Sequence, residues 1–169
     1  MKRLVVVSNR LPPHPVSRSQ AQRATPVGGL ASALKGALKR APGSLWLGWS
    51  GTVAPSSGAE RLVRYTLEGV HLAGLHLTSR EVSGYYRGFA NEALWPLCHG
   101  FQGRVQLSLD EEATYRRVNA RFARALRPLL ADGDLIWVHD YHLILLGSEL
   151  RRLGWTGRIG FFLHIPFPP

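Results

Sequence analysis

The chain has 169 residues, 45% hydrophobic and 19% charged, which predicts one soluble globular domain with a sizeable core. No apolar run approaches the ~20 residues of a membrane span, and the N-terminus lacks the apolar core of a secretory signal, so we expect no membrane association. A single cysteine, Cys98, excludes an internal disulfide framework and favours a cytoplasmic location.

The charge is concentrated in one half of the chain. The net charge is +10, and the first 59 residues contain no Asp or Glu although they contain eight Lys or Arg residues. Such a one-signed segment attracts anions, which could be phosphorylated metabolites, nucleotides or nucleic acid. A solvated arginine-rich surface is the alternative. Because no zinc knuckle, aromatic RNA-binding signature or basic heptad region accompanies the charge, we do not expect a nucleic-acid partner.

The N-terminal segment predicts a strand, a loop and a helix. Leu4 to Ser8 is a continuous β-branched run typical of a buried strand, and it is followed by prolines that cannot continue a ladder. The polar stretch from His14 to Val27 is long for a loop in a compact domain and is therefore mobile or functional. Gly28 and Gly29 then open a predicted helix with apolar residues at helical spacing.

The middle of the chain predicts a strand and then a hairpin. Leu45 to Trp49 is the strand, and Arg61 to Tyr65 with Val70 to Leu77 form the pair, with Gly69 at the break.

Three helices are expected next. A short one starts at Ser79, a second covers Asn91 to His99, and a long one runs from Leu109 to Leu130. Ser108 followed by Glu111 predicts a capping box at the start of the long helix.

The last third of the chain predicts a βαβ unit. Two apolar runs, within Asp134–His142 and Arg158–Pro169, each look like a strand buried on both faces. Leu143 to Leu153 between them has the length of a helix. Together with the earlier elements, this alternation predicts an α/β fold with a Rossmann-like, mostly parallel sheet.

Several polar residues follow predicted strands, where ligands of open α/β sheets bind. Arg10 follows the first strand, Asp140 follows the strand that ends in His139, and His164 follows the last strand. A guanidinium suits a phosphate or carboxylate because its planar fork donates two parallel hydrogen bonds, although a surface arginine resting on its own loop is the alternative. The Asp140 carboxylate could accept hydrogen bonds from hydroxyl groups.

Two further motifs leave alternatives open. Gly28 and Gly29 at a helix start could cradle a phosphate on backbone N–H groups, or simply form a tight turn, because they complete neither a Walker loop nor GxGxxG. The aromatic patch Tyr85-Tyr86-Arg87 with Trp95-Pro96-Leu97 could line a sugar site or pack in the core.

Metal and nucleophilic chemistry are poorly supported by the sequence. His139, Asp140 and His142 contain metal-ligand types, but no fourth ligand is spaced nearby, so we expect no metal and no other cofactor. We also find no Gly-x-Ser-x-Gly elbow and no pair of carboxylates suited to glycoside hydrolysis, so no residue is assigned as catalytic.

In combination, the motifs are far more specific than any one of them. The blocks are LVVVSNRLP (4–12), GGL (28–30), WLGWSG (46–51), YY (85–86), LWPLCH (94–99), WVHDYHL (137–143) and GFFLHIPFP (160–168). They closely resemble, in order and over nearly the whole chain, the N-terminal part of glycosyltransferase family 20, the trehalose-6-phosphate synthases.

This resemblance implies a GT-B fold, in which two Rossmann-like domains face each other across a cleft. It implies a retaining glucosyltransferase that moves glucose from UDP-glucose to glucose 6-phosphate and gives α,α-trehalose 6-phosphate. Residues 1–169 would be the acceptor-side N-terminal domain, incomplete at its C-terminal end, and the C-terminal nucleotide-sugar domain would be absent. The stretch from His14 to Val27 departs from the family in its extra arginines and prolines.

The resemblance also implies roles for individual residues. Those expected on the acceptor glucose 6-phosphate are Arg10, on its phosphate, with Tyr86 and Asp140. Those expected on the donor UDP-glucose are Gly28, Gly29 and His164. Trp95 and Ile165 would shape the pocket that selects the α anomer.

Other readings stay open at this point. A related glucosyltransferase such as a glucosylglycerol-phosphate synthase would share these motifs, and a non-catalytic truncated fragment could still bind sugar phosphate. Self-association into a homo-oligomer is also an open alternative.

Overall fold

The computed structural model describes residues 3–12, 34, 36–38, 40–41, 43–56 and 61–168. The expected roles of Gly28 and Gly29, and the expected loop from His14 to Val27, therefore fall outside the described residues.

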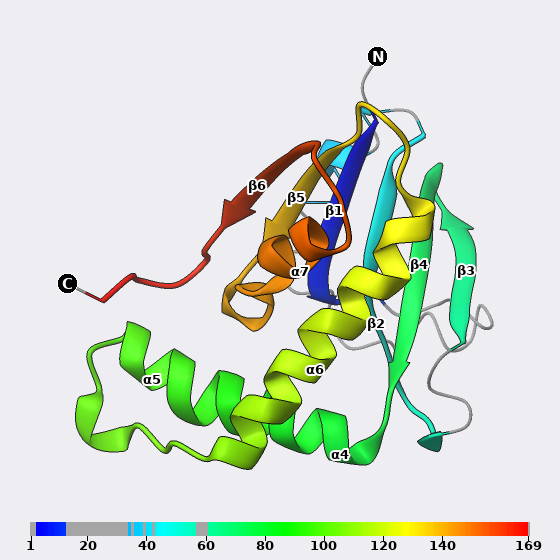
Figure 1. Cartoon of the computed structure of the whole chain (residues 1–169). Helices are drawn as coiled ribbons and strands as arrows, with labels where there is room; N and C mark the ends of the chain where they lie inside the picture. Colours follow the sequence, from blue (N-terminus) through cyan, green and yellow to red (C-terminus); the bar gives the residue numbers. More distant parts are fainter. Residues whose placement is uncertain are drawn as a thin grey trace.

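A six-stranded sheet forms the centre of the described part of the chain (Figure 1). Its order is β3-β4-β2-β1-β5-β6, and every neighbouring pair is parallel except the antiparallel pair β3–β4. The strands are β1 (Leu4–Arg10), β2 (Leu45–Val53), β3 (Leu62–Leu67), β4 (Val70–Leu77), β5 (Leu135–His139) and β6 (Arg158–Phe162). The prediction of a mostly parallel α/β sheet is confirmed.

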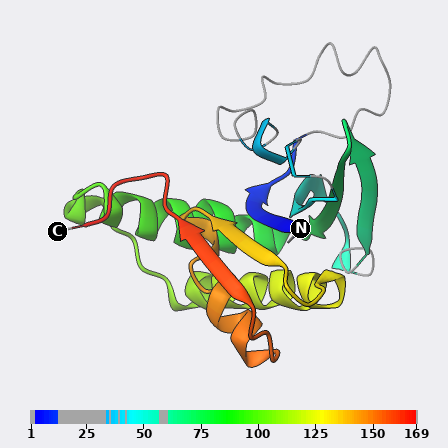
Figure 2. The same ribbon diagram turned by 90° about the horizontal axis from the view of Figure 1, so that it is seen from above.

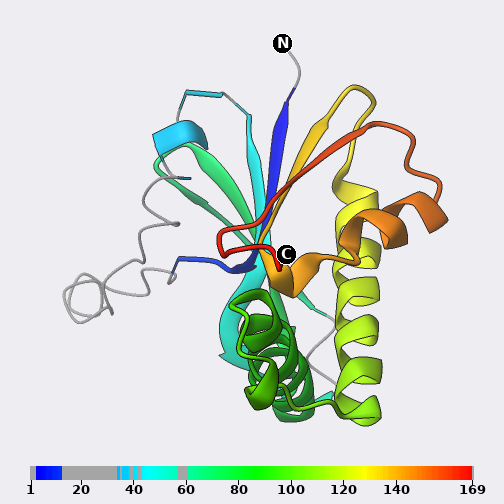
Figure 3. The same cartoon turned by 90° about the vertical axis from the view of Figure 1, so that its left-hand side faces the viewer.

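The unbroken apolar run of β1 is explained by cover on both of its faces. Val5 and Val7 lie in the larger core, beneath the long helix α6 (Leu109–Leu126), whereas Val6 lies in a second core with Leu34 and Leu38. Because successive side chains of a strand point to opposite faces, both faces need apolar residues. Figure 3 shows α6 on one side of the sheet and the short helical piece near residue 38 on the other.

The helical region after β4 differs from its prediction. Instead of two separate helices, α4 (Ser79–Glu81), the π-helical η1 (Val82–Leu94) and α5 (Trp95–Cys98) follow each other without a break. Gly88 is buried within this segment and faces the side chain of Glu111 on α6. A Cβ at Gly88 would collide with the carboxylate of Glu111 on α6. The Glu111 carboxylate therefore occupies the space that a side chain at position 88 would need.

The start of α6 is capped, as expected, by Ser108. Its hydroxyl accepts a hydrogen bond from the Glu111 N–H at 3.4 Å. A reciprocal capping box forms instead at α4, where Thr78 and Glu81 exchange side-chain and backbone hydrogen bonds. The predicted long helix holds as far as Leu126 and then continues as a 3-10 turn, η3 (Arg127–Leu129).

The C-terminal βαβ unit is confirmed, with one correction. β5 leads through the 3-10 turn η4 (Tyr141–Leu143) and α7 (Leu146–Arg152) to β6, which pairs parallel with β5. The expectation that both strands are buried on both faces is wrong for β6. Phe161 and Phe162 are 47% and 48% exposed, because β6 is an edge strand with a single neighbour in the described chain. Figure 2 shows this edge from above.

The described helices include none that is both long enough and apolar enough to cross a bilayer.

Candidate functional site

The candidate site lies where the parallel strands end. Arg10 is the last residue of β1, Asp140 follows β5, and His164 follows β6. Because β1, β5 and β6 are parallel neighbours, these residues lie at one edge of the sheet. The helical segment η1 adds Tyr86 to the same region through its contacts with the turn after β5.

The Arg10 guanidinium is exposed and rests on a neighbouring strand. Its central carbon lies 5.3 Å from the centre of the Trp49 ring on β2. Gly51 leaves room for it, since a Cβ there would lie 2.9 Å from the guanidinium Nη2. Its contacts within the described residues are thus with β2, and the loop from His14 to Val27, on which the alternative depends, lies outside them. The Trp49 ring thus supports the exposed guanidinium, whose planar fork suits an anion.

A row of rings runs from Arg10 to Asp140. The rings of Trp49 and Tyr86 have their centres 6.3 Å apart, and Tyr86 stacks on His142 at 5.5 Å with 20° between the planes. His142 Nδ1 then lies 3.9 Å from Asp140 Oδ2. The three residues expected to bind the acceptor are thus joined by Trp49 and His142.

Asp140 has an unusual backbone. Its φ and ψ of 77° and 163° fall in a region that is populated almost solely by glycine. Its Oδ1 accepts hydrogen bonds from the backbone N–H of Tyr141 at 3.0 Å and of His164 at 3.4 Å, and its own N–H donates to the Phe162 carbonyl at 2.8 Å. The residue therefore ties the ends of β5 and β6 together.

The second oxygen, Asp140 Oδ2, is not used in those bonds. The Asp140 side chain is 18% exposed, so this oxygen can accept from a ligand hydroxyl.

A second tie joins the same two strand ends. His139 Nδ1 and His164 Nε2 are 2.9 Å apart. His139 is buried, and both burial and the neighbouring His164 lower its pKa to about 4. The ring is therefore neutral near pH 7.

Buried tyrosines form the floor beneath this edge. The Tyr85 hydroxyl donates to Asn9 Oδ1 at 2.9 Å, and the Tyr141 hydroxyl donates to Asn91 Oδ1 at 2.9 Å. Burial raises the pKa of both phenols above 10, so both stay protonated. Sequence reasoning assigned no role to these asparagines. The position of Asn9, directly after a buried run and next to Arg10, is the signal that could have found it.

Sequence reasoning also missed Trp49 and the role of His142. The buried His142 ring packs between Tyr86 and Tyr141, with ring centres 5.5 Å and 4.0 Å away. Neither ring nitrogen has a hydrogen-bond partner among the described residues. Burial lowers the pKa of His142 to about 4.

The two buried histidines predict a pH dependence of stability. An unfolded histidine binds a proton near its ordinary pKa of 6.5, whereas the folded rings resist it until about 4. Between these values the unfolded state holds more protons, so the free energy of unfolding falls as the pH falls. Urea denaturation should show constant stability above about pH 7 and a loss from pH 6.5 to 4. A His142→Leu variant should show a flatter profile; an unchanged profile would contradict the assignment for His142.

Two predicted residues stand apart from the row of rings. Trp95 stacks on His99 with ring centres 4.0 Å apart, and among the described residues no ring contact or hydrogen bond joins it to Arg10, Tyr86 or Asp140. Ile165 lies in the segment after β6, which runs toward α5 in Figures 1 and 2. Their expected role in selecting an anomer stays a prediction.

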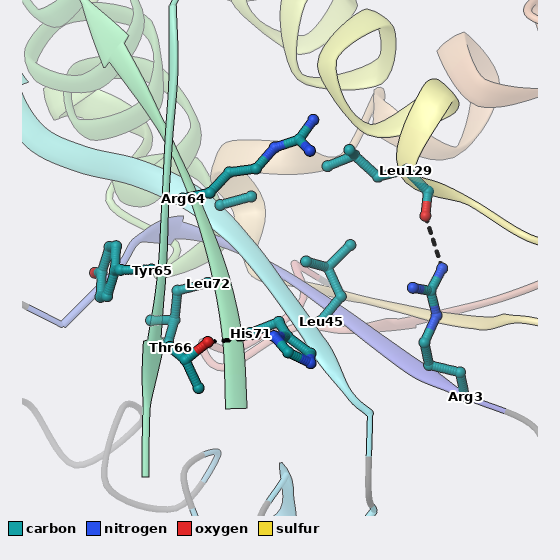
Figure 4. A pocket seen from close by; sticks show the side chains of 9 residues that line it. Arg3, Leu45, Arg64, Tyr65, Thr66, His71, Leu72 and Leu129 are labelled. Atoms are coloured by element: carbon teal, nitrogen blue, oxygen red, sulfur yellow. Dashed lines mark hydrogen bonds between the residues drawn. The ribbon is translucent and has the colours of Figure 1, made fainter. Parts of the chain in front are cut away.

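This edge holds no metal cluster among the described residues, and a pocket that the structure shows lies elsewhere. Within residues 3–12, 43–56, 61–168 and the other described positions, no group of three His, Cys, Asp or Glu residues could hold a metal ion. A pocket of about 440 Å³ lies on the sheet near the opposite strand ends (Figure 4). It is lined by Arg3, Leu45, Arg64, Tyr65, Thr66, His71, Leu72, Ala73 and Leu129. The strand-end geometry, rather than this pocket, defines the candidate site.

Comparison with known proteins relates this geometry to a family. Residues 2–169 match the model of glycosyltransferase family 20. A curated trehalose-6-phosphate synthase from Sinorhizobium fredii is 46% identical over 169 residues, which is 100% of this chain and 35% of the relative. The chain thus spans about a third of the length of the curated relatives it matches.

Solved structures agree. An α,α-trehalose-phosphate synthase (UDP-forming) from Burkholderia xenovorans, in complex with glucose-6-phosphate, has a TM-score of 0.85 and 43% identity, over 98% of this chain and 34% of that one. An E. coli structure bound with UDP-2-fluoro glucose has a TM-score of 0.83 and 44% identity, over 99% and 34%.

Proposed function

The chain belongs to glycosyltransferase family 20, and on this premise we propose that it forms the acceptor side of a retaining glucosyltransferase of trehalose biosynthesis. Glucose would pass from UDP-glucose to glucose 6-phosphate and give α,α-trehalose 6-phosphate. The observation that carries the proposal is the row of side chains from Arg10 through Tyr86 to Asp140, which offers a cation and a carboxylate at one sheet edge.

Arg10 would bind the phosphate of the acceptor. Its guanidinium is exposed, held against Trp49 and able to donate two parallel hydrogen bonds. Tyr86, half-buried between Trp49 and His142, would lie along the sugar. Asp140 would accept from sugar hydroxyl groups through Oδ2, because Oδ1 already holds two backbone N–H groups.

The donor side rests on fewer described residues. His164 is exposed at the end of β6 and would contact the transferred glucose. Gly28 and Gly29 would lie against the donor diphosphate, and Trp95 with Ile165 would select the α anomer. A second, nucleotide-binding domain would complete the cleft of a GT-B fold.

The chemistry would depend on positioning rather than on a protein nucleophile. The resemblance to the family implies that the leaving phosphate helps to remove the proton of the acceptor hydroxyl. This chain would contribute the orientation of glucose 6-phosphate, which lowers the entropic part of the barrier. Charge on the leaving diphosphate would be stabilised by fixed donors.

A transfer assay tests the proposed function. The chain is assayed alone and joined to the remaining two thirds of the Sinorhizobium fredii relative, with UDP-glucose and glucose 6-phosphate as substrates. We expect trehalose 6-phosphate from the joined protein, and binding of glucose 6-phosphate without product from the chain alone. Transfer to glycerol 3-phosphate instead would identify a glucosylglycerol-phosphate synthase. Binding without transfer in both proteins would identify a non-catalytic module and contradict the proposal.

A cytoplasmic location, the absence of a nucleic-acid partner and assembly into a homo-oligomer remain predictions. Salt-sensitive binding to DNA would contradict the second of these.

A further inference from the structure

We propose that His139 is a positioning residue that fixes the tautomer of His164, so that His164 presents an N–H donor to the transferred sugar. This inference concerns the donor side of the site and rests on the proposed function for the identity of the sugar. The arrangement of protons within the pair is independent of that function.

The two rings are aligned for a hydrogen bond. His139 Nδ1 lies 2.9 Å from His164 Nε2, the ring planes are 24° apart and the ring centres are separated by 5.1 Å. With the nitrogens this close and the ring centres this far apart, the two imidazole rings meet edge to edge. A hydrogen bond between two neutral imidazoles needs one N–H and one lone pair at the contact.

Two arrangements of protons satisfy that contact. Either His139 Nδ1–H donates to His164 Nε2, or His164 Nε2–H donates to His139 Nδ1. In the second arrangement the remaining proton of His139 lies on its Nε2. That nitrogen is buried and has no hydrogen-bond partner among the described residues.

The burial of His139 Nε2 selects the first arrangement. A buried N–H without a partner loses its hydrogen bond to water, and orphaned buried donors are rare in folded proteins. Placing the proton on Nδ1 uses it in the bond to His164 and leaves a lone pair at the buried position. His139 is neutral near pH 7, since burial and His164 lower its pKa to about 4.

The tautomer of His164 then follows. Because its Nε2 accepts from His139, its proton lies on Nδ1. The residue is exposed, and its backbone N–H is held by Asp140 at 3.4 Å, so both the ring and the main chain are anchored. The ring thus offers an oriented donor, suited to a hydroxyl oxygen of a sugar and unsuited to a ligand that must donate there.

Nitrogen NMR of the histidine rings tests the inference without any activity measurement. Seven histidines give a small set of signals, and two-bond proton–nitrogen spectra distinguish the two neutral tautomers. His139→Asn and His164→Gln assign the pair, and His71→Asn, at an exposed site on β4, controls for unspecific changes. We expect Nδ1–H on both residues at neutral pH. Nε2–H on His164 in the unsubstituted chain would overturn the inference.

Two substitutions of His139 should differ in their effect on the proton of His164. His139→Asn can keep an N–H near the position of Nδ1, so the tautomer of His164 should not change. His139→Asp offers only acceptor oxygens and should shift the proton of His164 to Nε2. In the joined protein, glucose transfer should fall by about tenfold for His139→Asp, the equivalent of one hydrogen bond, and by less than about threefold for His139→Asn. Equal losses in the two variants would show a merely structural role for His139.

The transfer assay and the ring spectra distinguish a failure of the proposed function from a failure of the tautomer assignment. If the unsubstituted joined protein transfers no glucose, the proposed function fails, but the ring spectra still decide the tautomer.

Discussion

The Asp140→Gly variant should be more stable than Asp140→Ala by about 1–3 kcal/mol, the reverse of the usual order of these residues. Both variants lose the carboxylate and its hydrogen bonds to Tyr141 and His164, so those losses cancel in the comparison. What differs is the backbone. At φ 77° and ψ 163° glycine is unstrained, whereas alanine keeps the strain that aspartate bears now.

Urea denaturation of both variants measures this difference. A matched pair at Asp110, in the first turn of α6, should show alanine as the more stable residue by about 0.5–1 kcal/mol. If alanine is also the more stable residue at position 140, the backbone strain is not real.

The same variants test the functional value of the strain. Under the proposed function both should lose affinity for glucose 6-phosphate by about ten- to a hundredfold, because a charge-assisted acceptor is removed. Asp140→Asn, which tolerates positive φ better than alanine and keeps an acceptor oxygen, should lose less. If Asp140→Gly is more stable than the unsubstituted chain but binds glucose 6-phosphate more weakly, the backbone strain at Asp140 is retained for function.

Arg10→Ala should weaken binding of glucose 6-phosphate by about 10- to 150-fold and leave binding of glucose nearly unchanged. Hydrogen bonds to a charged group are worth about 1.5–3 kcal/mol each, and the unphosphorylated sugar lacks the group that Arg10 would bind. Calorimetric titration of both sugars gives the two ratios. Equal losses for glucose and glucose 6-phosphate would contradict a phosphate contact.

Two further arginine variants control this experiment. Arg10→Lys keeps the charge but not the planar fork, so its loss should be intermediate. Arg124→Ala removes an exposed arginine from α6, distant in sequence from the strand ends, and should bind both sugars as the unsubstituted chain does. A loss in Arg124→Ala would show that the overall positive charge, not Arg10, attracts the phosphate.

Strong local patterns were sufficient to predict most of the described fold. The continuous β-branched run around Val6 predicted a strand covered on both faces, and Gly69 marked the hairpin, where its φ of 83° fits a tight turn. Aspartate and histidine placed after strands predicted the edge at which Asp140 and His164 now meet. These predictions succeeded for one reason: each pattern lies within a few residues of the feature that it predicts.

The errors concern contacts between distant residues. Apolar Phe161 and Phe162 suggested a covered strand, but the position of a strand within a sheet is not encoded in its own run. The residues around Gly88 likewise gave no sign of its closeness to Glu111, which is 23 residues away in the sequence. The contacts of Trp49 and His142 with Tyr86 likewise join three separate elements.

The row of rings between Arg10 and Asp140 has a consequence for specificity. Its two ends are carried by β1 and by the turn after β5, and β1 and β5 are hydrogen-bonded neighbours in one sheet. Strand spacing cannot adjust to a ligand as a loop can. Under the proposed function, the fixed distance between the Arg10 guanidinium and the Asp140 carboxylate therefore selects acceptors by their length. It would admit acceptors whose phosphate and hydroxyl groups are the right length apart and reject shorter or longer ones.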